Sequence, residues 1–260
     1  MARRVSRRKE PERGRFQLKE LEKVEGGIFD TRTMVYLGKF FNSGIVQRLE
    51  FPIARGKEAD LYLADAGGSK AVSGSAYVVL KFFRVETSSF KNMIDYIVGD
   101  ERFSRIRNSK YFIVNTWCKK EYGNLKIAEA AGVMVPKPYM ANGSILAMEF
   151  IGSSEGRAAP MLKDTRVSDP AGMFDLIIGY VKSLYKFRLV HADLSEYNIL
   201  VNEDKPYLID FGQAVTIKHP NAQEFLERDI GNIARYFNKQ YSLGIEEKEI
   251  FEKVTGYQKQ

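Results

Sequence analysis

The 260-residue sequence contains a single cysteine, Cys118, and no apolar run that approaches the length of a membrane-spanning helix. One cysteine excludes an internal disulfide framework and favours a reducing compartment. The N-terminal stretch MARRVSRRKEPERGR is basic, but no apolar segment follows it, so a secretory signal peptide is not expected. These absences predict a soluble, cytoplasmic protein without a membrane segment.

The composition is that of an ordinary globular chain, with 44% hydrophobic and 28% charged residues, which excludes disorder throughout. Lys and Arg number 40 against 33 Asp and Glu, so the formal net charge is +7. This excess favours an acidic partner such as nucleic acid or phosphate, although charge alone does not establish one. The chain also lacks an internal repeat, and its length suits one large domain or two lobes.

The first half of the chain reads as a basic head followed by helices and strands. Residues 1–15 are basic with almost nothing apolar, which predicts a mobile tail, and short helices are expected at 16–25 and 31–43. The runs LEFPIARGKEADLYLADA and AYVVLKFFRV alternate or are β-branched, and they predict an antiparallel sheet. Residues 84–110 lose this periodicity, so we expect a flexible, irregular insert with one turn of helix near 90–97.

The second half is richer in helix signals. A helix is expected from about 115 to 131, closed by Gly132, and ILAMEFIG reads as a further strand. Asp169 and Pro170 suit the N-cap and first turn of another helix, whose apolar face is formed by Met173, Phe174, Ile177, Ile178, Val181 and Leu184. The segment NAQEFLERDIGNIARYFNKQ predicts one more amphipathic helix.

The stretch LVHADLSEYNILVNEDKPYLIDFGQA, which lies between the last two expected helices, carries the clearest chemical signal. Asp193, Asn198 and Asp210 each stand where a short apolar strand meets a loop. Carboxylates beside an apolar core must be hydrogen-bonded or bound to a cation, and two close together repel unless positive charge lies nearby. One carboxylate and one amide oxygen, completed by phosphate oxygens, suit Mg²⁺, so Asn198 and Asp210 are the candidate metal ligands.

Two earlier residues complete the parts of a phosphoryl-transfer site. Lys81, in the strand VVLKFF, could hold the α- and β-phosphates of ATP, and Glu121 in the following helix could fix this lysine by an ion pair. Asp193 would then orient or deprotonate the attacking hydroxyl. Lys81, Asp193 and Asp210 are therefore the candidate catalytic residues.

The sequence resembles the RIO family of atypical serine protein kinases, and within it a compact, archaeal-like member of the type-one branch. The resemblance rests on GKEADLY, VVLKFFRVETSSFKNMIDYIVGDERF, KKEYGNL, MEFIG, LVHADLSEYNIL, LIDFGQAV and HPNAQEFLERDIGNI, which together span most of residues 30–238. The Gly-Lys-Glu loop, the long insert after the strand lysine and the lack of a winged-helix-sized N-terminal domain favour the type-one branch.

The resemblance implies a two-lobed, α+β kinase-like fold, with an antiparallel-sheet N-lobe and a mainly helical, truncated C-lobe. The tail would be 1–15, a helical extension 16–48, the N-lobe 49–151 with its insert at about 84–110 and hinge at 149–151, and the reduced C-lobe 152–260. Nucleotide would contact Lys81, Glu121, Asn198 and Asp210, the loop residues Arg55, Gly56, Lys57, Glu58 and Ala59, the gatekeeper Met148, and Glu149 and Ile151 of the hinge.

The resemblance also implies ATP with Mg²⁺ or Mn²⁺ as cofactors, and the pre-ribosomal small subunit and its rRNA as partners. The loop departs from the G-x-G-x-x-G of ordinary kinases, because only Gly56 stands in PIARGKEADLY. Ala192 replaces the arginine of His-Arg-Asp, so control through a phosphorylated activation loop is not expected. No Ala-Pro-Glu follows Gly212, so the usual peptide groove is not expected either.

Several functions therefore remain open from the sequence. The chain could phosphorylate serine, including its own Ser88, Ser89, Ser104 or Ser109, or hydrolyse ATP as a switch through a phosphorylated Asp210. A small-molecule phosphotransferase of the aminoglycoside type and a nucleotide-binding scaffold without catalysis are the alternatives. The loop GKEADLY and the insert argue against the small-molecule enzyme, and the complete residue set argues against the scaffold.

Individual residues also have ordinary structural interpretations. Asp210 could be a turn residue, Lys81 could face water from an edge strand, and Glu129 competes with Glu121 on the same helix. His191 is expected to pack behind the loop, His219 to be a loop residue, and Trp117 and Cys118 to lie in the core. Asp229, early in its helix, could accept hydrogen bonds from the backbone around residues 191–193.

Overall fold

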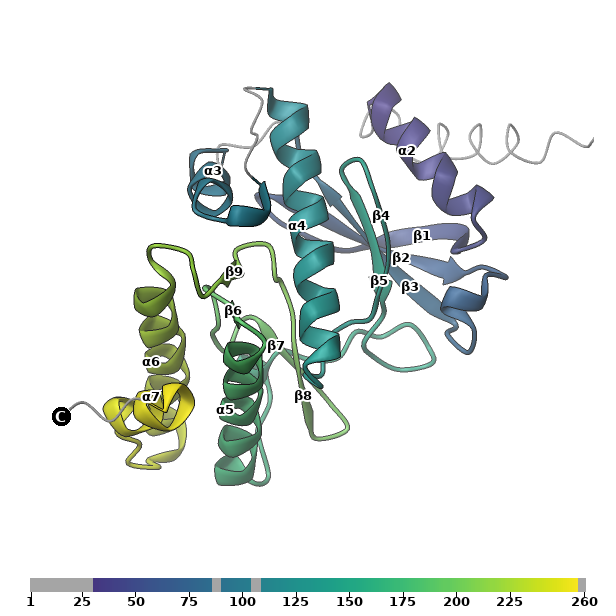
Figure 1. The fold of residues 1–260 in the computed structure, drawn as a ribbon. Coiled ribbons are helices and arrows are strands. Elements are labelled where there is room, and N and C mark those ends of the chain that lie inside the picture. Colours follow the sequence, from purple (N-terminus) through teal and green to yellow (C-terminus); the bar gives the residue numbers. More distant parts are fainter. Residues whose placement is uncertain (1–29, 86–89, 104–108, 257–260) are drawn as a thin grey trace, which may run out of the picture.

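The computed structural model describes residues 30–85, 90–103 and 109–256. The expected tail at 1–15 and helix at 16–25 lie outside these residues, as do Ser88, Ser89 and Ser104 of the insert. The described chain forms two lobes, one built on a sheet and one mainly helical (Figure 1). In the described part of the chain, no helix is both long and apolar enough to cross a bilayer.

The first lobe is built on a five-stranded antiparallel sheet in the order β1-β2-β3-β5-β4. Its strands are β1 (Val46–Arg55), β2 (Ala59–Ala66), β3 (Tyr77–Phe83), β4 (Pro138–Asn142) and β5 (Ile145–Glu149). The predicted antiparallel sheet is thus confirmed, with β4 added. Lys81 pairs with Leu61 on one side and Leu146 on the other, so it stands in the central strand and not at an edge.

Helix α2 (Thr31–Asn42) covers one part of this sheet and confirms the helix expected at 31–43. The Asp30 carboxylate caps its first turn by accepting a 2.7 Å hydrogen bond from the Thr33 amide. Leu37 and Phe40 are fully buried in a core that also includes Tyr62 of β2. The start of the sheet is therefore fastened by the preceding helix.

The described part of the insert is more regular than expected. It holds a nine-residue helix, α3 (Phe90–Val98), and a 3₁₀ turn, η2 (Glu101–Phe103), where we predicted an irregular segment with one helical turn. Met93 and Ile97 are four residues apart on one helical face, and both are fully buried. This apolar pair explains why the helix forms, because it anchors α3 in the main core.

Helix α4 (Lys110–Ala130) lies between the sheet and the second lobe in Figure 1. It starts five residues before the predicted 115, since the buried Ile113 and Val114 extend its core-facing side. Its end agrees with the prediction: Gly132 adopts a left-handed φ of 74° just past the last turn. The helix contacts both the sheet and the β6 strand of the second lobe, so its side chains reach the junction.

The second lobe packs three helices around two short antiparallel ribbons of two strands each. The helices are α5 (Pro170–Lys186), α6 (Ala222–Tyr241) and α7 (Glu247–Thr255), and a 3₁₀ turn, η3, spans Leu162–Asp164. The ribbons pair β6 (Leu189–Val190) with β9 (Val215–Thr216) and β7 (Ile199–Asn202) with β8 (Lys205–Leu208). The predicted apolar face of α5 is buried throughout, and Asp169 caps its N-terminus. The ribbons place the loops that follow β6 and β8 beside the first lobe.

Candidate active site

A cavity of about 500 Å³ lies between the sheet of the first lobe and the ribbons of the second lobe. Lys81, Glu121, Asp193 and Asp210 line it, together with the predicted loop and hinge residues Arg55, Gly56, Lys57, Glu58, Ala59, Met148, Glu149 and Ile151. Asn198 does not line this cavity, although it contacts Asp193. The structure thus brings together all but one of the sequence-predicted residues on a single cleft.

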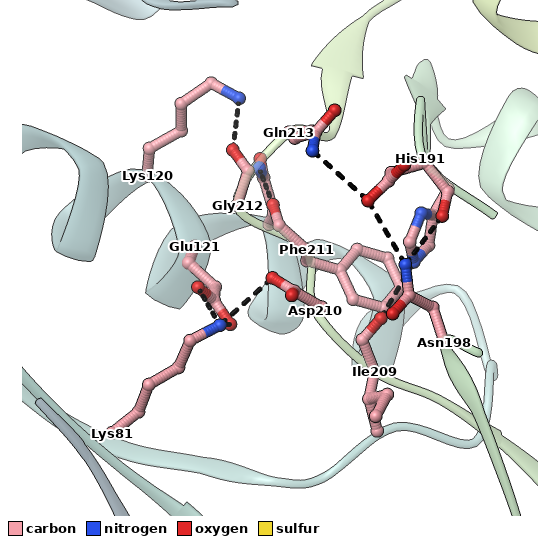
Figure 2. A network of polar contacts seen from close by, with 12 residues as sticks. Lys81, Lys120, Glu121, His191, Asn198, Ile209, Asp210, Phe211, Gly212 and Gln213 are labelled. Atoms are coloured by element: carbon pink, nitrogen blue, oxygen red, sulfur yellow. Dashed lines mark hydrogen bonds and ion pairs between the residues drawn. The ribbon is translucent and has the colours of Figure 1, made fainter. Parts of the chain in front are cut away.

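The ammonium group of Lys81 lies between the carboxylates of Glu121 and Asp210. Its Nζ atom is 2.8 Å from Oε1 and 2.9 Å from Oε2 of Glu121, and 3.0 Å from Oδ1 of Asp210 (Figure 2). Burial alone would lower the pKa of Lys81, but the charges of Asp210 and Glu121 raise it above its ordinary value. The ammonium is therefore charged, and it is already held in place before any phosphate arrives. Glu129, the competing residue, is exposed.

Asp210 follows β8 in a backbone conformation that is unusual for a residue with a side chain. Its φ is 63°, in the left-handed region, and its side chain is half exposed toward the cleft. Burial would raise its pKa, but the nearby Lys81 ammonium overrides this effect and lowers it. The carboxylate is consequently anionic at neutral pH and faces the space where phosphate would lie.

Asp193, in the loop after β6, is held by two side-chain amides. Asn198 Nδ2 donates to the Asp193 backbone oxygen at 2.8 Å and to Oδ2 at 3.2 Å, and Gln213 Nε2 donates to Oδ2 at 3.1 Å. Burial and the charge of Asp210 raise the pKa of Asp193 to about 6. This carboxylate is thus ionised at neutral pH but basic enough to take a proton. The sequence alone suggested no role for Gln213, although this residue directly follows the Asp-Phe-Gly motif at 210–212.

The loop that carries Asp193 is fastened from beneath by α6. The carboxylate of Asp229 accepts a 2.8 Å hydrogen bond from the Ala192 amide and another of 2.8 Å from the Leu194 amide. These bonds confirm the contact predicted for Asp229. Arg228 also donates to the Ala192 carbonyl oxygen, a contact that the sequence did not suggest. Ala192 has a φ of 65°, so these contacts hold a strained backbone in place.

The two histidines have structural positions. His191 is buried, its ring centroid lies 4.5 Å from that of Phe211, and its Nε2 lies 3.0 Å from the Ile209 carbonyl oxygen. Burial lowers the pKa of His191 to about 4, so the ring is neutral at pH 7 and packs behind the loop as predicted. His219 lies in the loop between β9 and α6, as expected, where it is buried and accepts a hydrogen bond from the Asn221 amide. Trp117 and Cys118 lie in the core as expected.

The oxygen atoms at this site suit a magnesium ion bound together with phosphate. Asp210 presents a carboxylate to the cleft, whereas the side-chain amide nitrogen of Asn198 donates to Asp193 beside it. No group of three or more His, Cys, Asp or Glu residues that could cage a metal occurs in the described chain. Mg²⁺ commonly takes one or two protein oxygens and completes its shell with waters and phosphates, so the residues fit it.

Comparisons with known proteins agree with this geometry. Residues 60–250 match the model of the RIO domain. The chain is 38% identical over 257 residues to the RIO-type serine/threonine-protein kinase Rio1 of Haloferax volcanii, covering 97% of this chain and 86% of that protein. It is 46% identical over 170 residues to the protein of the same name from Thermoplasma acidophilum, covering 65% of this chain and 89% of that protein.

A solved structure extends the likeness to the fold. The Rio2 kinase of Chaetomium thermophilum, in an ADP/Mg²⁺-phosphoaspartate complex, aligns with a TM-score of 0.63 at 21% identity, covering 93% of this chain and 80% of that chain. This similarity supports the predicted two-lobed, α+β kinase-like fold. The names of the relatives favour a protein kinase over an aminoglycoside-type enzyme.

Proposed function

The chain belongs to the RIO family of serine/threonine kinases, in its Rio1 branch, and we propose that its cleft transfers the γ-phosphoryl group of ATP with the help of Mg²⁺. Membership of this family makes it a phosphotransferase. The observation that carries the proposal is the convergence of Lys81, Asp193 and Asp210 on one cleft, with Glu121 and Asn198 fixing two of them.

Each of these groups has a distinct part in binding the substrate. Lys81, held by Glu121, would contact the α- and β-phosphates of ATP. The loop Arg55–Ala59 would cover the phosphates, and the backbone of Glu149–Ile151 would meet the adenine. Asp210 and Asn198 would hold Mg²⁺, which when bound neutralises charge on the phosphate oxygens.

Asp193 would act on the attacking hydroxyl. Its ionised carboxylate accepts the hydroxyl proton, or orients that hydroxyl toward the γ-phosphorus, while Gln213 and Asn198 fix its direction. Asp229 and Arg228 keep the loop backbone in the conformation that this task requires. The chain would therefore rely on fixed positioning where other kinases use a phosphorylated loop.

Two acceptors are proposed for the phosphoryl group. One is serine, including autophosphorylation; of the candidate serines in the insert, Ser109 is described and exposed at the start of α4. The other is Asp210: a carboxylate oxygen attacks the γ-phosphorus, ADP leaves, and water then cleaves the acyl phosphate to release phosphate and restore the carboxylate. The phosphoaspartate in the similar Rio2 kinase supports this second route, which would make the chain an ATPase switch.

The proposed setting is maturation of the small ribosomal subunit, with the pre-ribosomal particle and its rRNA as partners. The resemblance to the RIO family suggests this setting, and the net charge of +7 is compatible with binding to RNA. ATP turnover would then time the residence of the chain on the particle.

The product of the reaction separates these routes. The purified chain is incubated with γ-labelled ATP and Mg²⁺, and free phosphate, acid-stable label and hydroxylamine-sensitive label on protein are followed. Label on serine would identify a kinase, and free phosphate with hydroxylamine-sensitive label would identify an ATPase that uses Asp210. Nucleotide binding without any turnover, with or without ribosomal particles, would contradict both routes and favour the scaffold.

A further inference from the structure

Helix α4 carries two fully buried polar side chains, Lys120 and Asn124, that the site described above does not use. Lys120 directly precedes Glu121, but the two side chains make different contacts (Figure 2). A buried ammonium and a buried amide are costly unless hydrogen bonds and opposite charge compensate for lost water. Their partners therefore indicate what these residues do.

Both side chains bind the backbone that directly follows Asp210. Lys120 Nζ donates to the Gly212 carbonyl oxygen at 2.9 Å and to that of Ala214. Asn124 Nδ2 donates to the carbonyl oxygens of Phe211 at 2.8 Å and Ala214 at 2.9 Å. Three carbonyls of one short loop are thus held by four hydrogen bonds from a single helix.

The loop also packs tightly against the same helix. A Cβ atom added at Gly212 would lie 2.9 Å from Nε1 of Trp117, so no side chain fits between the loop and α4. Asp210 itself has a left-handed φ of 63°, a conformation that persists only where surrounding contacts enforce it. The four hydrogen bonds supply such contacts immediately after the strained residue.

The insert supplies part of the charge that balances the buried ammonium. Burial lowers the pKa of Lys120 to about 7; the carboxylates of Asp100 and Glu121 oppose this shift by favouring the charged form, whereas Arg102 adds to it. Asp100 is buried next to η2, and its carboxylate accepts a 2.8 Å hydrogen bond from Nε of Arg102. The segment GDERF, whose role the proposed function leaves open, therefore contributes to the surroundings of Lys120.

We propose that Lys120 and Asn124 are positioning residues for phosphoryl transfer, which hold the carbonyls of residues 211–214 against α4 and so keep Asp210 oriented toward the metal and phosphates. The proposal rests on the proposed function, because it assigns Asp210 to Mg²⁺. In this way α4 supports both sides of the cleft: Glu121 fixes Lys81, and Lys120 and Asn124 on the same helix fix the loop of Asp210.

The test measures the affinity for ADP in EDTA and in Mg²⁺ by calorimetry. Lys120→Met keeps the approximate length of the side chain but removes its hydrogen-bond donors, and Asn124→Ala removes the two hydrogen bonds from the Asn124 amide. Lys119→Met, at an exposed position on the same helix, is the control. We expect the gain in affinity on adding Mg²⁺ to fall by about tenfold or more in Lys120→Met, the equivalent of one charged hydrogen bond. Affinity in EDTA should stay at the wild-type value, as should both affinities in the control.

The outcomes separate this proposal from the proposed function. If the wild-type chain showed no gain in ADP affinity on adding Mg²⁺, the proposed function itself would be contradicted. A normal gain in the wild type together with an undiminished gain in Lys120→Met and Asn124→Ala would overturn the positioning role. An equal loss in EDTA and in Mg²⁺ would mean general loosening of the cleft and would also overturn it. If Lys120→Met does not fold, Asn124→Ala alone tests the proposal. The expected result for that variant is a smaller loss of ADP affinity that occurs in Mg²⁺ and not in EDTA.

Discussion

Lys81 of β3 and Glu121 of α4 form a buried ion pair, with Nζ 2.8 Å from Oε1 and both side chains at most one-tenth exposed. The pair joins the central strand of the sheet to the helix that also contacts the loop of Asp210. A charge fixed in this way loses little further conformational freedom when it meets phosphate. The pair therefore preorganises the cleft.

Replacing Glu121 with Gln should weaken the use of ATP. The amide keeps the size of the side chain but removes the charge that fixes Lys81. We expect kcat/KM for ATP to fall by about 10- to 100-fold, which corresponds to one charged hydrogen bond. Steady-state kinetics beside Glu129→Gln, an exposed glutamate on the same helix, provides the matched control. Equal losses in the two variants would refute a specific role for Glu121.

Activity should fall on the acid side as Asp193 is protonated. Burial and the charge of Asp210 raise the pKa of Asp193 to about 6, and only the ionised carboxylate can accept a proton. The rate should therefore be full above this value and drop as the pH falls through about 6. Asp193→Asn should lower kcat by about 10²- to 10⁴-fold.

The pH profile of kcat between pH 5 and 8 provides the check on Asp193. The residual activity of Asp193→Asn should lack the acid limb, while its affinity for ADP stays close to that of the wild type. An acid limb that persists unchanged in the variant would assign the titration to another group.

Removing the Asp229 carboxylate should loosen the loop that carries Asp193. Asp229→Ala leaves the amides of Ala192 and Leu194 buried without their acceptor. Each such amide costs about 1–3 kcal/mol, so the free energy of unfolding should drop measurably in urea titrations. Glu227→Ala, an exposed change on the same helix, should have little effect. Undiminished stability and activity in Asp229→Ala would show that the two hydrogen bonds are dispensable.

The basic N-terminal residues 1–15 should contribute to RNA binding. Each lysine or arginine that neutralises a phosphate adds to the slope of log K against log salt. Deleting these residues should therefore make the slope shallower for a small-subunit rRNA fragment, as measured by fluorescence anisotropy between 50 and 200 mM salt, about the range in which such effects are large. An unchanged slope would show that the tail does not contact the RNA.

The sequence predicted those parts of the molecule that local patterns encode. The Asp169 cap and the apolar face of α5 follow from spacing within one helix, and both are present. Lys81 and Asp210 could be identified because each stands in a short motif flanked by apolar strands. Glu121 was separated from Glu129 only by the structure, since both occupy the same helix and the fold decides which one faces the cleft.

The features that the sequence did not reveal depend on contacts between distant segments. Lys120 looks like a residue on a solvated helix face, because its partners are backbone carbonyls more than ninety residues away. The roles of Gln213, in the loop after Asp210, and of Arg228, on α6, likewise emerge only when the fold brings them to Asp193 and Ala192. The insert was underestimated because the two residues that bury α3, Met93 and Ile97, form too short a pattern to stand out.

The central claim is that Lys81, Asp193 and Asp210 act together as one Mg²⁺-dependent phosphoryl-transfer site. The most direct measurement is consumption of γ-labelled ATP by the wild type, Asp193→Ala and Asp210→Ala, with ADP affinity measured on the same samples in EDTA. We predict turnover in the wild type that requires Mg²⁺ and is lost in both variants, while the variants still bind ADP. Undiminished turnover in either variant would contradict the claim.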